Sequence, residues 1–187
     1  NPGYPFDEQR TDNEHASGDF VDYLNSLNDP RLTKYITPDY SYLFGSRIGS
    51  YFGSISSPVE FITYEEMLFV KSEATLRATG DYAAAEAFYK TGIQASMDKL
   101  GVDAASSATY IAANGTLPTT DVNTAIAKVS LQEYLALYLN PEAWTLWRRT
   151  GAPALTPTAG TNGIPRRFLY PQSEYSLNSA NAPQGTL

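Results

Sequence analysis

The sequence predicts an all-α fold of paired helices, joined by long loops and followed by an irregular C-terminal segment. Apolar residues recur at helical spacing in residues 60–101 and again in 121–139. Capping residues precede these runs and glycines follow them, as at the two ends of a helix. Residues 151–187, which we name the strap, are rich in Pro, Gly, Thr and Asn and show no helical period.

Composition limits the kinds of partner. The chain has 187 residues, enough for one domain, and lacks the long apolar run of a transmembrane helix. Its net charge of −7 argues against nucleic acid and against anionic lipid, since both attract basic surfaces. Cysteine is absent, which excludes a disulfide, a thiolate nucleophile and a zinc–thiolate site. His15 is the only histidine, and we expect it to be a solvent-exposed loop residue; we expect no metal and no cofactor.

The first 59 residues are expected to hold one helix and then aromatic-rich loops. Residues 1–18 are polar and rich in turn formers, which is typical of a surface loop. A helix is predicted over 19–28, ending at Asp29-Pro30 because the residue before proline is driven out of the α region. Its apolar face consists of Phe20, Val21, Leu24 and Leu27.

Residues 33–58 combine aromatic side chains with frequent Gly and Ser. Partial alternation from Tyr40 to Phe44 is compatible with a short strand or an extended loop. Two interpretations stay open: the rings are exposed, because so many glycines hinder regular burial, or they pack onto the helical core. The aromatic residues are Tyr35, Tyr40, Tyr42, Phe44, Tyr51 and Phe52.

Residues 60–101 predict a helical hairpin. Thr63 and Glu66 have the spacing of a capping box, which stabilises a helix by roughly 1 kcal/mol. Gly80 ends the first helix and Asp81 caps the second, which ends at Gly101. The pattern resembles a tetratricopeptide-type pair, which needs stacked neighbours to bury its outer face. The expected inward residues are Leu68, Phe69, Ala74, Leu76, Ala84, Ala85, Phe88, Tyr89, Ile93 and Met97, with Ala74 and Ala85 allowing close approach.

Residues 102–150 predict further helices, a short one near 104–113 and an amphipathic one over 121–139. The apolar face of the second comprises Val122, Ile126, Val129, Leu131, Leu135, Tyr138 and Leu139. A last helix begins at Pro141 with Asn140 as its cap and stops at Gly151 and Pro153.

The end of this last helix and the strap hold both tryptophans, Trp144 and Trp147, and four of the 13 basic residues. Arg guanidinium groups stack on aromatic rings and bond to carboxylates or carbonyls. We expect the strap to wrap the helices that precede it. A structural role is one interpretation; a binding surface is the other, because Trp and Arg are enriched in hot spots.

No catalytic constellation is recognisable: the chain lacks a nucleophile elbow, a phosphate loop and a zinc-protease helix. A glycosidase needs two carboxylates across a cleft, whereas Glu65 and Glu66 point about 100° apart on one helix. Glu73 faces the hairpin interior, where Arg148 or Arg149 is a plausible partner. We therefore assign no catalytic residue.

Several ordered motifs make the chain resemble the SusD/RagB family. They are Asp29-Pro-Arg-Leu32, the segment FITYEEMLFVKSEA with its GDYAAAEAFYKTGI hairpin, NPEAW-WRRTG, Ile164-Pro-Arg-Arg167 and YPQSEY. Glu133-Tyr134 departs slightly from the family pattern. The resemblance runs nearly end to end and implies the C-terminal part of a SusD-like domain, residues 1–187. Within it lie residues 1–59, the hairpin 60–101, the helices of 102–150 and the strap.

The resemblance implies a stacked tetratricopeptide-like α-fold and a nutrient-binding lipoprotein of the Bacteroidota outer membrane. Such proteins sit on the cell surface through an N-terminal lipid and bind glycans or other nutrients without cleaving them. They pass the ligand to a SusC-like TonB-dependent transporter. This chain has no cysteine, so we expect the lipid anchor to lie outside it. The alternative function is that of a helical-repeat adaptor that binds only protein. A third possibility is a glycan hydrolase, but the sequence lacks the pair of acids that such an enzyme needs.

The candidate ligand site comes from composition. A pyranose places its C–H face on an aromatic ring, while its hydroxyls require polar side chains such as Arg. Residues 33–58 offer both, and we select Tyr40, Tyr42, Arg47 and Tyr51 as the ligand-binding residues.

Overall fold

The structure is a computed structural model that describes residues 18–38, 46–54, 56–157, 160–161, 163–168 and 170–181. The chain divides into two compact units, Asn1–Pro153 and Ala154–Leu187. The described part of the first unit is mostly helical, with one small antiparallel ribbon, so the all-α prediction is confirmed. His15 and the rest of the predicted N-terminal loop up to residue 17 lie outside the described residues.

The first described elements are short. The predicted helix is present, with Phe20 and Leu24 buried, and a turn containing Asn28 follows it. Ile36 pairs with Ile48 and Pro38 with Ser46 in the ribbon. The elements are α2 (Gly18–Ser26), α3 (Leu32–Tyr35), β1 (Ile36–Pro38), β2 (Ser46–Ile48) and α4 (Ser50–Gly53).

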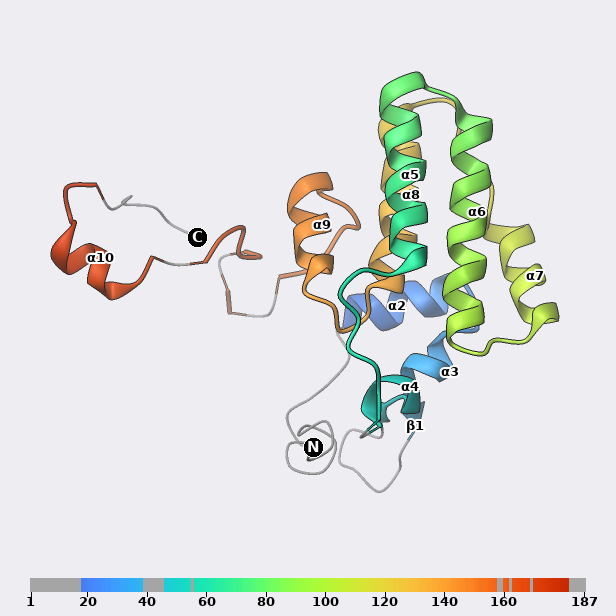
Figure 1. Ribbon diagram of the computed structural model, residues 1–187, viewed down its shortest axis with the longest axis horizontal. Coiled ribbons are helices and arrows are strands. Elements are labelled where there is room, and N and C mark those ends of the chain that lie inside the picture. The colour runs from blue at the N-terminus through green and yellow to red at the C-terminus, as the bar shows by residue number, and fades with distance from the viewer. Residues whose placement is uncertain are drawn as a thin grey trace. The chain divides into compact units, whose positions relative to one another are not determined.

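The predicted hairpin forms as two antiparallel helices, α5 (Tyr64–Thr79) and α6 (Tyr82–Lys99), shown side by side in Figure 1. Thr63 and Glu66 make the reciprocal capping box, and Gly80 ends α5 in the left-handed conformation with φ of 64°. Asp81 accepts a hydrogen bond from the backbone N–H of Ala84 at 3.0 Å. The capping residues in the sequence therefore predicted correctly where α5 begins and ends and where α6 begins.

One inward residue of the hairpin was predicted wrongly. Ala74 is exposed, whereas the neighbouring position Ser72 is buried against α6. The Ser72 hydroxyl donates to the Ala85 carbonyl at 2.8 Å, which ties the two helices together. Phe69 lies where a side chain on Gly92 would clash, since an added Cβ would come within 2.9 Å of its ring. Close approach thus depends on Ser72, Ala85 and Gly92.

Three more helices complete the described part of this unit: α7 (Ala104–Asn114), α8 (Val122–Ala136) and α9 (Glu142–Thr150). Leu139, expected on the inner face of α8, lies beyond its end and is exposed. Helix α9 begins one residue later than predicted, after Pro141, although the Asn140 side chain still accepts from the N–H of Glu142 at 3.0 Å. Gly151 ends α9 in the left-handed conformation, as predicted.

Two apolar clusters form the core. The larger one lies among α5, α6, α7 and α8 and includes Phe69, Tyr89, Ile93, Met97 and Val129. The smaller one gathers around α2 and α3, where the buried side chains are those of Phe20, Leu24, Tyr35, Leu100 and Leu135. Figure 1 shows α8 behind α5, so the hairpin packs on α8 with one face.

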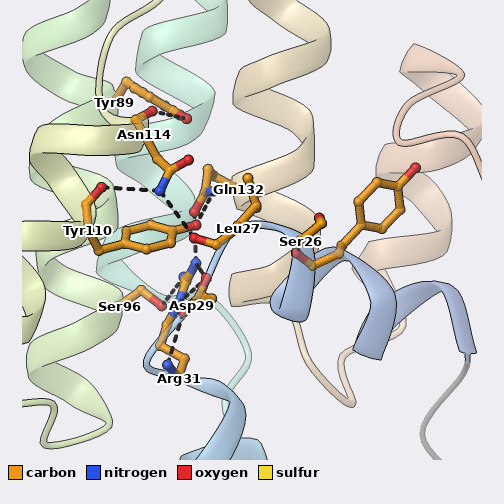
Figure 2. Close-up of polar contacts among 10 residues, drawn as sticks. Ser26, Leu27, Asp29, Arg31, Tyr89, Ser96, Tyr110, Asn114 and Gln132 are labelled. Atoms are coloured by element: carbon orange, nitrogen blue, oxygen red, sulfur yellow. Dashed lines mark hydrogen bonds and ion pairs between the residues drawn. The ribbon is translucent and has the colours of Figure 1, made fainter.

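A buried arginine, Arg31, joins the α2–α3 junction to the neighbouring helices (Figure 2). Arg31 is fully buried, and its guanidinium donates to both carboxylate oxygens of Asp29, the shortest of these bonds being 2.6 Å. It also donates to Ser96 of α6 at 3.0 Å and to Gln132 of α8 at 2.7 Å. Gln132 in turn donates to the hydroxyl of Tyr110 in α7 at 2.6 Å. One side chain thus links the α2–α3 junction to three other helices.

The α2–α3 junction has a second tie, at the end of α7. The Asn114 side chain donates to the carbonyl of Leu27 at 3.4 Å and to that of Tyr110 at 3.3 Å. The hydroxyl of Tyr89 donates to the Asn114 carbonyl at 3.3 Å. These bonds satisfy backbone groups at two element ends, which otherwise lack partners.

The second unit contains α10 (Gln172–Leu177). The prediction that the strap has no helix is therefore wrong at this point. Pro171 precedes the helix, a position that suits proline because its fixed φ fits a helix start. The Asn178 side chain donates to Glu174 at 3.1 Å at the other end. The expectation that the strap wraps the earlier helices stays a prediction.

The substitution Asp29→Asn tests the buried arginine. It keeps the shape of the side chain but leaves the Arg31 cation without a counter-charge in the core. Breaking a buried ion pair in this way typically destabilises a protein by about 3–5 kcal/mol. We expect a loss of this order in the free energy of unfolding, measured by urea denaturation followed by circular dichroism.

The matched control is Asp98→Asn on the exposed face of α6, where Asp98 accepts one bond from Gln94. A surface change of this kind stays within about 0.5 kcal/mol of wild type. Equal stability of the two variants would contradict the assigned role of the pair.

Candidate glycan-binding site

The predicted site residues fall within residues 33–58, whose described part includes the small ribbon and α4. Strands β1 and β2 pair at Pro38 and Ser46, which holds the two ends of segment 39–45 together. Arg47 lies in β2 with its backbone opposite Thr37. Tyr40 and Tyr42 lie outside the described residues. Of the four predicted residues, the structure therefore describes the backbone of Arg47 and the side chain of Tyr51.

Gly49 anchors the hairpin to the body of the unit. Its N–H donates to the Tyr35 carbonyl at 2.7 Å, just beyond the end of β2. A Cβ at this position would come within 1.8 Å of the Lys34 carbonyl oxygen. Only glycine allows this backbone approach. Glycine in this segment therefore permits a close-packed turn here, instead of hindering burial.

Tyr51 of α4 is half-buried and has partners within the protein. Its hydroxyl donates to Glu60 at 2.7 Å, and its ring packs edge-on against Phe52 with centroids 4.9 Å apart. Burial, and next the hydrogen bond to Glu60, raise the pKa of Tyr51 to about 12. Its hydroxyl is therefore neutral across the physiological range and is oriented by the fold.

For the described aromatics of residues 33–58, packing on the core is the interpretation that holds. Tyr35 is fully buried and contacts Phe20 edge-on at a centroid distance of 5.4 Å. Phe52 lies 5.8 Å from Tyr35 and 5.2 Å from Tyr138. A half-buried ring next to this cluster, such as Tyr51, combines fixed orientation with partial exposure.

A polar group beside Tyr51 was not anticipated from sequence. Lys99 of α6 forms ion pairs with Glu60, at 3.0 Å, and with Glu65. Its ammonium also lies 5.7 Å from the centre of the Tyr51 ring. Burial opposes the charge of Lys99, but the hydrogen bonds that its ammonium donates to Glu65 and Glu60 outweigh this effect, so the pKa of Lys99 shifts upward. The group fixes segment 57–63 against α6 and α4.

Glu73, the acid singled out in sequence, is buried and paired as expected. It accepts hydrogen bonds from Arg149 of α9 and from Arg77, the latter at 2.7 Å. Burial favours the neutral acid, but these two arginines outweigh it, so the pKa of Glu73 shifts downward. The predicted partnership with Arg148 or Arg149 is confirmed for Arg149, and it joins α5 to α9.

A second buried acid, Glu133 of α8, lies near this pair. Its Oε2 is buried and accepts no hydrogen bond from the described residues. Burial raises the pKa of Glu133 to about 8, with Arg149 opposing the shift and Glu73 and Glu66 adding to it. Glu133 is therefore protonated at neutral pH. The sequence offered a signal, because Glu133 falls on the apolar stripe of α8.

Arg148 stacks on Trp144 at the exposed side of α9, with the guanidinium carbon 4.5 Å from the ring centre. Trp147 points inward and is buried. The described residues contain no group of three His, Cys, Asp or Glu side chains placed to hold a metal ion. In the described segments, no helix is both long and apolar enough to cross a membrane.

The fold defines a class: an α-helical protein built on a tetratricopeptide-like pair, with a short ribbon carrying the candidate site. Residues 1–171 match the model of the SusD-like family described as starch-binding and associating with the outer membrane. The chain belongs to this family, and the resemblance stated from its motifs is confirmed. No curated protein matches the chain.

Solved structures show the same fold. A SusD homologue from Bacteroides fragilis NCTC 9343 is 22% identical, with a TM-score of 0.74 over 96% of this chain and 50% of its own. One from Bacteroides thetaiotaomicron VPI-5482 is 23% identical, with a TM-score of 0.68 over 88% of this chain and 45% of its own. The chain therefore spans about half the length of these relatives.

The raised pKa of Glu133 predicts a pH dependence of stability. The pKa of a Glu in an unfolded chain is about 4.3. Between pH 5 and 8, Glu133 therefore holds a proton in the folded state that it has lost in the unfolded state. Its contribution to stability is full below the unfolded pKa and is lost as the pH rises through about 8. Between these two pKa values, Glu133 makes the free energy of unfolding fall by up to about 1.4 kcal/mol for each pH unit.

Glu133→Gln removes the titrating carboxyl while keeping the size of the side chain. The free energy of unfolding of this variant therefore does not fall between pH 5 and 8, and at pH 8 the variant is more stable than wild type. Urea unfolding at pH 5 to 8 measures both curves. Glu142→Gln, an exposed acid of α9, is the control and follows wild type. If the free energy of unfolding changed with pH in the same way for wild type and Glu133→Gln, the raised pKa assigned to Glu133 would be wrong.

Proposed function

We propose that this chain is the C-terminal part of a glycan-capturing protein of the outer-membrane surface. It binds oligosaccharides without cleaving them and passes them to a SusC-like TonB-dependent transporter. The full-length protein is held at the membrane by an N-terminal lipid outside this chain. The observation that carries the proposal is the family match over residues 1–171, whose family is described as starch-binding and outer-membrane associated.

The candidate ligand surface is the hairpin of residues 36–48 together with Tyr51. An oligosaccharide needs aromatic faces for its C–H surfaces and fixed polar groups for its hydroxyls. Tyr51 supplies a half-buried ring with an oriented hydroxyl. In the sequence, Tyr40 and Tyr42 fall between β1 and β2; Arg47 lies in β2, and the ribbon is held to the helical body by Gly49. Capture needs such a preorganised frame, because loops that must be ordered on binding lower the affinity.

The buried acids have structural partners, which supports binding over hydrolysis. A glycosidase needs one carboxylic acid and one carboxylate exposed to the same sugar bond. Glu73 is covered and bonded to two arginines, and Glu65 is covered and paired with Lys99. Neither acid is available to a glycan in this arrangement.

The test is a glycan array that includes starch-derived oligosaccharides, with free reducing ends assayed in the same wells. We expect binding without new reducing ends. Tyr40→Ala and Tyr42→Ala weaken binding by roughly 1–3 kcal/mol together, the range for loss of aromatic anchors in an interface. Circular dichroism of both variants remains that of wild type.

Tyr170→Ala is the matched control, since it removes an exposed tyrosine of the second unit. Unchanged affinity of the Tyr40 and Tyr42 variants would remove the hairpin from the site. New reducing ends would show an enzyme. If the full-length protein bound no glycan on the array, the result would favour the alternative function, a helical-repeat adaptor that binds only protein.

A further inference from the structure

The C-terminal end of α7 carries an Asn-Gly pair, Asn114-Gly115, one of two such pairs in the sequence. Asn followed by Gly is the dipeptide most prone to deamidation, because glycine has no side chain to hinder attack of its backbone nitrogen on the Asn side chain. The reactivity of the pair therefore depends on whether the fold permits this attack.

The turn at the end of α7 requires both residues of the pair. The Asn114 side chain donates to the carbonyls of Leu27, at 3.4 Å, and Tyr110, at 3.3 Å (Figure 2). An amide NH2 group has two donors for these two carbonyls, whereas a carboxylate has none. A Cβ on Gly115 would come within 2.5 Å of the Ile111 carbonyl oxygen, so a side chain here would clash with the backbone. The fold thus places a chemically labile dipeptide at this point.

Hydrogen bonds hold every group that takes part in the attack. Deamidation begins when the backbone nitrogen of Gly115 loses its proton and bonds to Cγ of Asn114. In the native structure this N–H donates to the Ile111 carbonyl at 2.7 Å. The Tyr89 hydroxyl donates to the Asn114 carbonyl at 3.3 Å, which fixes the peptide group that would have to rotate. Ring closure would break these two bonds and those of the side-chain amide.

The residues that follow the pair are held by side chains of two other helices. Glu86 of α6 accepts a hydrogen bond from the N–H of Leu117 at 2.8 Å, and Lys128 of α8 donates to the Thr116 carbonyl at 2.8 Å. Leu117 itself is buried in the larger apolar cluster. Opening the end of α7 therefore means breaking contacts with both α6 and α8.

We infer that Asn114 is a deamidation site that the native fold keeps closed and that reacts only in molecules in which the end of α7 has opened. In an open molecule, the Gly115 nitrogen gives its proton to water or hydroxide and forms a bond to Cγ of Asn114. The bond from Cγ to the side-chain nitrogen breaks, and ammonia leaves. Water then adds to either carbonyl of the succinimide ring and opens it to aspartate or isoaspartate.

The product does not rebuild the native turn. A carboxylate accepts hydrogen bonds but donates none, so the carbonyls of Leu27 and Tyr110 lose this donor. Isoaspartate also lengthens the backbone by one carbon atom. Deamidation thus converts a transient opening of α7 into a permanent loss of its connection to the α2–α3 junction.

The test follows Asn114 in the full-length protein at mildly alkaline pH, in native buffer and in urea. Trypsin releases residues 100–128, in which mass spectrometry detects deamidation, and an isoaspartate methyltransferase assay detects the rearranged product. We expect conversion in urea. In native buffer we expect a rate at least about tenfold lower, because opening a bonded helix end costs free energy. The other pair, Asn162-Gly163, is the reference for the reaction in urea.

Two variants loosen the turn without changing the Asn-Gly pair. Tyr89→Phe removes the bond to the Asn114 carbonyl, and Glu86→Ala removes the bond to Leu117. We expect native Asn114 to convert several-fold faster in each, with the rate in urea unchanged. Thr91→Ala, at an exposed position of α6, is the matched control and keeps the wild-type rate in both conditions. Circular dichroism checks that each variant is folded.

A further pair of variants tests the product. Asn114→Asp removes the two donations to carbonyls, and we expect unfolding at a lower urea concentration than in wild type. Asn123→Asp makes the same chemical change at an exposed position in the first turn of α8, where a negative charge is favourable. This control does not unfold at a lower urea concentration.

Three results would each overturn the inference. Equal rates in native buffer and in urea would show that the fold does not protect Asn114. An intact Asn114 in urea, where Asn162 converts, would show that it is not a deamidation site. Native rates of Tyr89→Phe and Glu86→Ala equal to that of wild type would show that these bonds do not control the opening.

Discussion

The guanidinium of Arg31 is the group on which the arrangement of the first unit depends. It is fully buried, and removing such a cation from water is unfavourable unless every donor finds an acceptor. Asp29 supplies the counter-charge from two residues away, and Ser96 and Gln132 supply the remaining acceptors from α6 and α8. Since these acceptors sit on separate helices, the charge is stable only when the helices are in their native positions.

The candidate site inherits its position from this constraint. Arg31 lies directly before α3, and α3 ends at Tyr35, whose ring is buried in the aromatic cluster. The carbonyl of Tyr35 then receives the N–H of Gly49, which places the return strand of the hairpin. The ribbon with Arg47, and α4 with Tyr51, are thus attached to the helical body through a short and well-bonded path. The half-buried ring of Tyr51 is therefore oriented by the fold itself.

Sequence reasoning succeeded where the cause of structure is local. Thr63, Gly80, Asp81 and Gly151 end or begin helices because of bonds and backbone angles within a few residues, so their roles are readable directly. It failed at Ala74, where two stripes on α5 are both apolar and periodicity does not say which one faces α6. It also did not foresee Glu133, because an acid on an apolar stripe is compatible with a misassigned face as well as with a buried, protonated carboxyl.

In the candidate site, too, local sequence features were predictable, whereas features that depend on tertiary contacts were not. Aromatic content identified the segment, but it did not distinguish Tyr35, a core residue, from Tyr51, which is half-exposed. The distinction comes from Gly49 and Glu60: one brings the backbone close enough to bury Tyr35, and the other holds the Tyr51 hydroxyl at the surface. The same carboxylate accepts a hydrogen bond from Lys99 of α6 at 3.0 Å, so one acid both orients the Tyr51 hydroxyl and fixes the segment before α5 against α6.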